Sequence, residues 1–481
     1  MEITPKKNRA GLTILVLVIT GCLLLSAGIV VGGYFILKST KDYKPPVVTA
    51  GPTATLRTIV EPPGPTATPG AGSTASPNTQ VTGVPPSIAG QMDRIQEQVL
   101  SYRGLPLKNE LMRDMMSDQD LKDVVVNDFF ADYTAEDAKN DAIELNVLGL
   151  LPAGFDLHQF YLDLYSEQIA GYYDSETKEM YVIGDEFKGP ERMTYSHEFT
   201  HVLQDQNYDL ETLLSDDACD ADSEYCAAVT ALVEGDATLS EQIWFLANGT
   251  EQDRTEITDF YNSFKSPVYD SAPAYMKSDF IFPYSQGFEF VYNLYNSGKW
   301  DAVDAAYANP PASTEQILHP EKYPDEVPVK VTLTDFTADL GPGWSEYDRN
   351  AMGEWYTYLI LSSGYDAKFR LADEDAKQAS AGWGGDTYVF LLNENSTDTA
   401  FAWLSTWDSQ KDSNEFYAAS RDYGKARWGT ASKSSNDSVT WNSSVDGTAT
   451  FIQNGKYVLW VVSPNEQVVD TLTPLVYFGG N

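Results

Sequence analysis

Two of the four histidines in this 481-residue chain stand four positions apart, with a glutamate directly after the first: His197, Glu198 and His201. Residues at this spacing leave one face of a helix about 6 Å apart, so both imidazoles can bind one tetrahedral zinc ion. Glu198 would lie beside the metal, where it can take a proton from water and later pass it to a leaving amine. The spacing predicts metal-assisted hydrolysis. The alternative is an accidental pair of histidines on a solvated helix.

A third ligand is needed because catalytic zinc sites use three protein ligands and leave one position for water. Glu234 is the candidate, since it stands in a run of small and apolar residues, 227–238, that reads as a second helix. A carboxylate in such surroundings needs a partner, whereas the alternative interpretation places Glu234 in solvent. We therefore expect a Zn²⁺ cofactor held by His197, His201 and Glu234.

These two segments resemble the gluzincins, zinc metallopeptidases in which a His-Glu-x-x-His helix is followed by a ligand glutamate on a second helix. The likeness is greatest to exported bacterial proteins with similar segments, here residues 197–206 and 234–237, and it covers roughly residues 169–323. It implies zinc at the three ligands and catalysis by Glu198. Thermolysin-like members carry an Asp four residues after the ligand glutamate to orient a histidine. Thr238 stands there instead, so we expect Asp236 or Asp205 to give that support.

The metzincins, the main rival clan, are excluded because Gln204 stands where their longer motif requires a glycine. Peptide hydrolysis also needs a donor for the developing oxyanion. Tyr284, at the expected start of a helix, and His319, before a proline, are the two candidate catalytic residues for this role. For each of them the alternative is a structural role, in packing or in a turn.

The elements around the motif are predicted from periodicity. A helix should begin near residue 88, with Ser87 as its cap, and further helical sequence covers about 121–151. Residues 172–182 read as a β-hairpin that leads into the motif helix. The edge of this hairpin could receive an extended peptide by strand addition, or the hairpin could simply pack on the helix.

Cys219 and Cys226 are the only cysteines beyond the N-terminal apolar segment, and they lie between the two ligand segments. A disulfide there would stiffen the connection, with an entropic effect of no more than about 2–3 kcal/mol. Zinc binding by the two thiols is the weaker alternative because paired Cys-x-x-Cys spacing is missing. A disulfide favours a location outside the cytoplasm.

The N-terminal segment 11–37 contains no charged residue and is long enough to cross a bilayer as a helix. The alternative is a lipoprotein signal with Cys22 as the lipidated residue. We favour the uncleaved anchor because the apolar run continues well beyond Cys22. The following Pro-, Thr- and Gly-rich residues, 38–87, cannot form a core and should be an extended tether.

The balance of 32 basic against 70 acidic residues gives a net charge of −38, which repels phosphate backbones and excludes nucleic acid as an expected partner. Beyond about residue 341, predicted strands and helices, including a hairpin at Asn454-Gly455, indicate a second unit. Its tryptophans are expected to pack in the core; a carbohydrate-binding platform is the alternative.

The sequence therefore predicts an α+β protein in five parts: a cytoplasmic tail (1–10), a transmembrane helix (11–37), a linker (38–87), a zincin-like, gluzincin-type metallopeptidase domain (88–340) and a smaller α+β domain (341–481). Residues 88–150 could instead form an inhibitory prosegment. The expected function is that of a membrane-anchored extracytoplasmic zinc metalloendopeptidase acting on peptides or proteins. The alternatives are an inactive zinc-binding envelope scaffold and a binding module displayed on a stalk.

Overall fold

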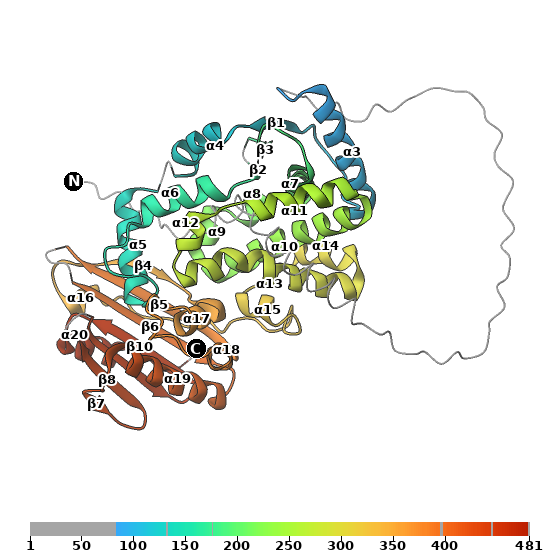
Figure 1. Ribbon diagram of the computed structural model, residues 1–481. Helices are drawn as coiled ribbons and strands as arrows, with labels where there is room; N and C mark the ends of the chain where they lie inside the picture. Colours follow the sequence, from blue (N-terminus) through green and yellow to red (C-terminus); the bar gives the residue numbers. More distant parts are fainter. Residues whose placement is uncertain (1–82, 131–132, 176, 395–397, 444–445, 480–481) are drawn as a thin grey trace, which may run out of the picture.

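The computed structural model describes residues 83–479, with gaps at 131–132, 176, 395–397 and 444–445. The predicted tail, the membrane anchor and almost all of the linker lie outside the described residues. Within the described part of the chain, no helix combines the length and the apolar character that crossing a bilayer requires. The described chain is α+β, as predicted, with a mainly helical body joined to a C-terminal sheet (Figure 1).

The helical body carries a three-stranded sheet in the order β1-β3-β2. Strand β2 (Gly171–Asp174) and β3 (Glu179–Ile183) are antiparallel, which confirms the predicted hairpin and leaves β2 at the edge. Strand β1 (Met112–Met116) pairs with β3 in parallel and was not predicted, because its residues do not alternate between polar and apolar. The helices of the body are α3 (Pro86–Arg103), α4 (Asp118–Val124), the π-helical turn η1 (Val125–Phe129), α5 (Ala135–Val147), α6 (Leu157–Gln168), α7 (Gly189–Tyr208), α8 (Leu210–Leu213), α9 (Asp216–Ala221), α10 (Ser223–Asn248), α11 (Glu251–Ser263), α12 (Pro267–Ser271), α13 (Ala274–Gly298), α14 (Trp300–Ala308) and α15 (Thr314–Leu318).

Three predicted boundaries were wrong. Helix α3 begins at Pro86 and has no side-chain cap, so Ser87 lies inside the helix; proline suits this position because its fixed φ matches the first turn. The helical region expected over 121–151 is divided among α4, η1 and α5. Tyr284 does not open a helix: it lies in the middle of α13, which continues through Pro283. An interior proline looks like a boundary in a sequence because it removes a backbone hydrogen bond.

The C-terminal sheet has seven strands in the order β4-β5-β6-β10-β9-β8-β7. The elements of this part are α16 (Thr337–Leu340), β4 (Trp344–Asn350), α17 (Gly353–Ser362), α18 (Asp373–Ser380), β5 (Trp383–Asn393), β6 (Thr399–Trp407), α19 (Gln410–Trp428), β7 (Lys433–Ser434), β8 (Ser438–Ser443), β9 (Gly447–Asn454), β10 (Tyr457–Ser463), α20 (Glu466–Leu472) and the 3₁₀ turn η2 (Thr473–Leu475). The predicted hairpin at Asn454-Gly455 joins β9 to β10.

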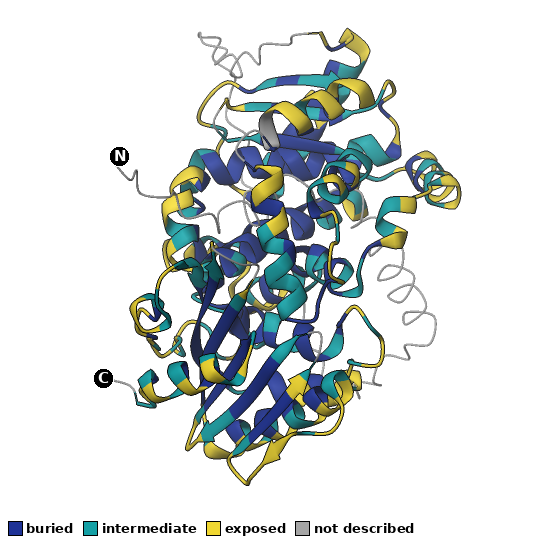
Figure 2. Ribbon diagram, turned by 90° about the vertical axis from the view of Figure 1, so that its left-hand side faces the viewer, coloured by how far each residue is buried: buried dark blue, intermediate teal, exposed yellow. Residues whose placement is uncertain are grey.

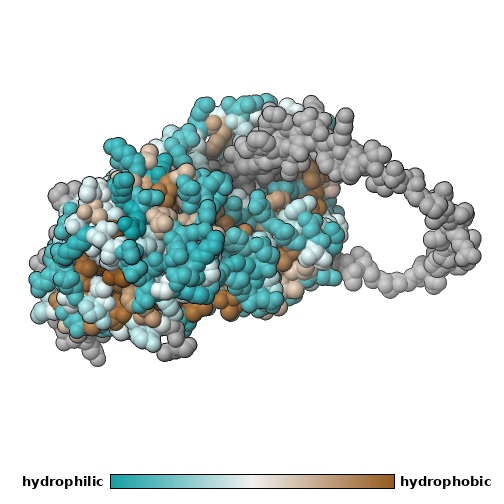
Figure 3. All heavy atoms as spheres, turned by 90° about the horizontal axis from the view of Figure 1, so that it is seen from below, coloured by the Kyte–Doolittle hydropathy of each residue, from teal (hydrophilic) through white to brown (hydrophobic). Residues whose placement is uncertain are grey.

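Both faces of this sheet are covered, so its central strands are buried over most of their length (Figure 2). Phe390 and Trp403 pack in one apolar cluster with residues of α19, while Val389 and Leu404 pack in another with residues of α20. Successive residues of a strand point to opposite faces, which explains the unbroken apolar runs in the sequence. Most of the tryptophans are buried in the core, in agreement with the predicted packing role. The described part of the face seen in Figure 3 is largely hydrophilic, with apolar residues in patches.

Helices α10 and α13 cross with their backbones in contact, because a glycine of each helix lies at the crossing. A Cβ on Gly235 would come within 2.2 Å of the Gly287 carbonyl oxygen, and one on Gly287 within 2.1 Å of the Ala231 carbonyl oxygen. Both glycines have helical backbones, so their small size is what the crossing requires. The disulfide between Cys219 of α9 and Cys226 of α10, predicted from the sequence, ties down the start of the same helix.

Replacing Gly235 by alanine should therefore destabilise the protein, by about 1–3 kcal/mol, since the new methyl group meets rigid backbone. Urea unfolding of the Gly235→Ala variant measures this change. Gly90→Ala is the matched control: its Cβ would meet only the Arg94 guanidinium, at 3.9 Å, so the better helix propensity of alanine should leave stability unchanged or raise it by up to about 1 kcal/mol. Equal effects in the two variants would contradict the close crossing.

Candidate metal centre

His197 and His201 of α7 and Glu234 of α10 meet at one point in the core of the helical body. The Nε2 atoms of the two histidines lie 3.2 and 3.5 Å from the same Glu234 oxygen, Oε2. All three side chains are buried. Within the described residues, these three form one of two groups whose potential ligand atoms all lie within 4.8 Å of one another. The structure thus brings the three predicted ligands together from two helices.

The other nitrogen of each imidazole is held by a hydrogen bond that fixes the tautomer. His197 donates from Nδ1 to Glu241, 3.1 Å away, and His201 donates from Nδ1 to the side-chain oxygen of Gln204, 2.7 Å away. Because Nδ1 carries a hydrogen in both rings, each neutral imidazole presents the lone pair of Nε2 toward Glu234, and a protonated ring donates a hydrogen bond to it from the same atom. This is the arrangement that orients metal-binding histidines.

The trio fits a metal ion because its facing atoms are all acceptors when the two imidazoles are neutral. Two Nε2 lone pairs then meet a carboxylate oxygen, and the second oxygen of Glu234 has no hydrogen-bond partner among the described residues although the side chain is fully buried. A cation between these groups removes the repulsion. Tetrahedral zinc with bonds of about 2.0–2.2 Å separates its ligand atoms by about 3.3–3.6 Å, close to the two distances observed. Two nitrogens and one oxygen are also a donor set that zinc accepts.

The electrostatics favour positive charge at the same point. Burial lowers the pKa of His197, but the hydrogen bonds with Glu234 and Glu241 outweigh burial and raise this pKa to about 10. The pKa of His201 is likewise raised, because the charge of Glu234 outweighs burial. In Glu234 burial opposes ionisation, yet the two histidines hold its pKa below the usual range. The carboxylate therefore remains ionised and available to a cation.

Gln204 is itself fixed by a buried ion pair. Its amide donates to Asp236 at 3.0 Å and to the Val233 carbonyl at 2.9 Å. Asp236 accepts two further hydrogen bonds of 3.0 Å from the Arg103 guanidinium. Asp236 thus supports a ligand histidine, as predicted, but through Gln204. Asp205, the other candidate, accepts instead from Tyr173 at 2.8 Å and from Lys178 at 3.0 Å.

Arg103 is the last residue of α3, so the segment considered as a prosegment contributes to the support of the centre. Helix α3 also shares an apolar cluster with α7, in which Met92 and Val99 pack with Phe199 and Val202. Removing this segment would expose that cluster and leave Asp236 buried without its cation. The segment is part of the folded body.

Glu198 lies where α7 meets the edge strand. Its side chain is 3 % exposed, and a Cβ on Gly171, the first residue of β2, would come within 3.4 Å of its Cγ. The same Cβ would lie 2.7 Å from Thr194 on α7. Glycine therefore lets β2 pass closely over the helix at Glu198.

The two predicted oxyanion donors differ in their placement. The Tyr284 ring is buried, with its centroid 6.4 Å from that of His197, which places it beside the ligand trio. His319 follows α15 and forms a 2.9 Å hydrogen bond through Nε2 with Glu354 of α17. His319 is not a member of the convergent group. The geometry favours Tyr284 for a role at this centre.

Sequence reasoning did not identify Glu241, Gln204 or Arg103. Glu241 stands seven residues after Glu234, two turns along α10, so it shares a face with the ligand and could have been found by helical spacing. Gln204 is three residues after His201, which is also a neighbouring position on a helix. Arg103 lies 133 residues from Asp236, and no local pattern joins them.

Comparison with known proteins gives one family match. Residues 342–473, from the sheet domain, match the profile of a family described as a Domain of unknown function (DUF8575). No curated protein sequence matches the chain. No solved structure matches it either.

Removing the carboxylate that holds His197 should weaken zinc binding. We expect Glu241→Ala to lower the affinity by about 10- to 100-fold, because the imidazole loses its orientation. Glu241→Gln should lose less, since the amide oxygen still accepts from Nδ1. Competition with a chromophoric chelator measures both affinities.

Thr238→Val is the matched control for this prediction. Thr238 lies on the same helix, and its buried hydroxyl has no hydrogen-bond partner among the described residues. Its zinc affinity should equal that of the unmodified chain. If Thr238→Val bound zinc more weakly and Glu241→Ala bound it as tightly as the unmodified chain, the support of His197 would have been wrongly assigned.

Proposed function

We propose that this protein is a zinc metalloendopeptidase of the gluzincin type, with a zincin-like arrangement of edge strand and active-site helices. One observation carries the proposal: three convergent, buried ligand atoms on two helices, with Glu198 next to the first of them. Three protein donors leave one position of a tetrahedral ion open to water or substrate, as catalytic sites require. Structural zinc sites normally use four protein ligands.

The proposed chemistry divides among named residues. Zinc, when bound by His197, His201 and Glu234, supplies Lewis acidity, which lowers the pKa of water and polarises a carbonyl group. Glu198 accepts the proton of the attacking water and returns it to the leaving amine. Tyr284 donates a hydrogen bond to the oxygen that becomes negative at the tetrahedral carbon.

Strand β2 is the proposed binding edge for the substrate. It pairs with β3 on one side only, and its first residue passes directly over Glu198. An extended peptide can add to such an edge through main-chain hydrogen bonds, which would lay its backbone along the helix that carries the catalytic groups. This favours a peptide or protein substrate over a small molecule.

The proposed location is outside the cytoplasm, on a single N-terminal membrane anchor. The uncharged segment 11–37 and the Pro- and Thr-rich linker support this location. The disulfide between Cys219 and Cys226 also supports it, because such bonds persist in oxidising compartments.

A second candidate is a zinc-binding scaffold without catalysis. The observation in its favour is burial: no ligand of the trio is more than 2 % exposed, and Glu198 is 3 % exposed. A peptide can reach these groups only if the elements above them separate. Activity separates the two candidates, since both bind zinc.

Cleavage by the unmodified chain and by the Glu198→Gln variant distinguishes the enzyme from the scaffold. We expect this variant to bind one zinc ion as tightly as the unmodified chain and to cleave a proteome-derived peptide library about 100- to 10,000-fold more slowly, because the amide cannot accept the proton. Glu211→Gln, an exposed glutamate on α8, removes the same charge and should leave cleavage unchanged. If the unmodified, zinc-loaded chain cleaves nothing in the library, the scaffold reading replaces the enzyme.

Tyr284→Phe tests the oxyanion donor. The loss of one donor should lower kcat by about 100- to 1,000-fold, with zinc affinity and KM little changed, because the hydroxyl acts only as negative charge develops. Tyr292→Phe, at an exposed position on the same helix, is the control and should keep full activity. An unchanged kcat in Tyr284→Phe would assign this tyrosine to packing alone.

A further inference from the structure

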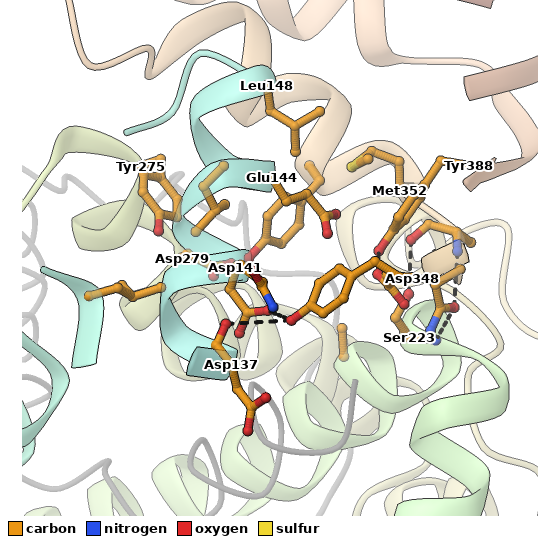
Figure 4. A pocket seen from close by; sticks show the side chains of 18 of the residues that line it. Asp137, Asp141, Glu144, Leu148, Ser223, Tyr275, Asp279, Asp348, Met352 and Tyr388 are labelled. Atoms are coloured by element: carbon orange, nitrogen blue, oxygen red, sulfur yellow. Dashed lines mark hydrogen bonds between the residues drawn. The ribbon is translucent and has the colours of Figure 1, made fainter. Parts of the chain in front are cut away.

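A cavity of about 520 Å³ lies where the helical body meets the C-terminal sheet (Figure 4). Helices α5, α6, α10 and α13 form its walls on one side, and β4, α17 and β5 form them on the other. Its size is in the range of sites for small organic ligands. None of the proposed metal ligands lines it.

The charge of the cavity is one-sided. Eight of its lining residues are Asp or Glu, and none is Lys, Arg or His; one of the eight, Glu346, is paired with Arg349 at 2.7 Å. Neutral donors hold the central carboxylates: Asp141 accepts from Tyr133 at 2.6 Å and from Tyr347 at 2.7 Å. Asp279 accepts from the Trp355 and Tyr356 side chains, each at 2.8 Å. Such donors satisfy oxygen atoms without cancelling negative charge.

Elsewhere the chain places a cation of its own within a comparable acidic group. Glu315, Glu326 and Asp408 converge on the Lys322 ammonium, at 2.6, 2.8 and 2.8 Å. In the cavity, burial and the charges of Asp348 and Asp141 raise the pKa of Glu144 instead. Carboxylates repel one another there, so a bound cation would relieve the repulsion.

A second observation points to a ligand. The Tyr275 side chain is 2 % exposed and lines the cavity; its hydroxyl faces that of Tyr161 but accepts no hydrogen bond among the described residues. Figure 4 shows this hydroxyl turned toward the side where Asp279 and Asp141 lie. A buried phenol oxygen that accepts no hydrogen bond costs free energy, and an N–H donor in the cavity would supply one.

The walls favour an organic cation over a metal ion. Aromatic rings, including Tyr161, Tyr356 and Tyr388, alternate with the carboxylates around the cavity, and aromatic faces attract ammonium and guanidinium groups. Calcium needs six to eight oxygen ligands close together. Among the described residues, no three ligand atoms in this cavity converge closely enough to form a potential metal group.

We propose that this cavity binds an alkylammonium or guanidinium group. The cation lies among Asp141, Glu144 and Asp279, the Tyr275 hydroxyl accepts a hydrogen bond from it, and its methylene groups contact the aromatic walls. Two sources share this chemistry: a free polyamine, and a lysine or arginine side chain of a peptide.

The peptide source is sterically reasonable because the cavity adjoins the metal centre. Ala227 lines the cavity and precedes Glu234 by two turns of α10, a rise of about 10 Å. Pro283 lines it too, and the next residue, Tyr284, lies beside His197. An extended peptide spans about 10 Å in three residues, so a basic side chain about three positions from the cleaved bond could enter. Of the two sources, only the peptide side chain rests on the proposed peptidase function.

The test uses the full chain and two probes of equal length, cadaverine and its neutral counterpart 1,5-pentanediol. Isothermal titration should show cadaverine binding with one site per chain and at least ten times more tightly than the diol. Glu144→Gln should weaken cadaverine at least tenfold; this side chain lines the cavity but takes no part in the proposed catalysis. Asp279→Asn is a second variant, in case the first fails to fold.

Glu289→Gln, which removes the same charge from the exposed side of α13, should bind cadaverine like the unmodified chain. The proposal is overturned if cadaverine binds no better than the diol, or if Glu144→Gln and Asp279→Asn, both folded by circular dichroism, bind it as tightly as Glu289→Gln does.

A competition experiment separates the two sources. The experiment uses zinc-loaded Glu198→Gln and a lysine-containing peptide. The cavity is a substrate subsite if this peptide displaces cadaverine and if its affinity falls when Glu144→Gln is added to the same chain. Binding of cadaverine and spermidine without displacement by peptides identifies a free-polyamine site. Either result supports the cation cavity, and neither depends on cleavage. A failure of the peptidase proposal can therefore be told apart from a failure of the cation-site proposal.

Discussion

The carboxylate of Glu234, buried between two imidazoles, imposes the main constraint on this structure. An ionised group without solvent is stable only beside positive charge or hydrogen-bond donors, and here the two imidazoles supply that charge when they are protonated or when they share a cation with Glu234. The other Glu234 oxygen has no hydrogen-bond partner among the described residues. The helices around Glu234 must therefore hold both imidazoles close to its carboxylate. Much of the surrounding core can be understood as the means of doing so.

Rigidity comes from contacts that leave little freedom to the two ligand helices. Helix α10 touches α13 backbone to backbone at Gly235, the residue directly after Glu234. Glu241 and Gln204 fix the two imidazoles, and the ion pair of Arg103 with Asp236 fixes Gln204 in turn. The hydrogen bonds that link Arg103 to His201 join three helices, α3, α10 and α7. A shift of any one of these helices therefore changes the orientation of His201.

Acidic side chains inside this protein are stabilised in three different ways. Imidazoles surround Glu234, the Lys322 ammonium lies among three carboxylates near the sheet domain, and phenol and indole donors hold Asp141 and Asp279 in the cavity. The cavity differs from the other two groups because none of its lining residues is Lys, Arg or His. The net charge of −38 adds to the negative potential at these acidic groups, so the whole molecule attracts cations toward them.

The sequence by itself determined what can be read from local spacing. The interval between His197 and His201 identified one face of a helix, the turn residues between two short runs of aromatic and apolar residues in 172–182 identified a hairpin, and Asn454-Gly455 identified a turn. It also determined that Glu234 stands among small residues, which allowed the second helix to be placed close to the first. These features depend on neighbours within a few positions, where helix and strand geometry alone decide which side chains share a face.

Only the tertiary structure decided which distant groups complete the centre and where the cavity forms. Arg103 meets Asp236 across 133 positions, and β1 joins the hairpin by parallel pairing that leaves no alternating pattern in its own residues. The carboxylates of the cavity come from α5, α10, α13 and β4, and each alone reads as an ordinary polar position. Their effect on one another depends on distance and on the exclusion of water, and both are properties of the packed chain.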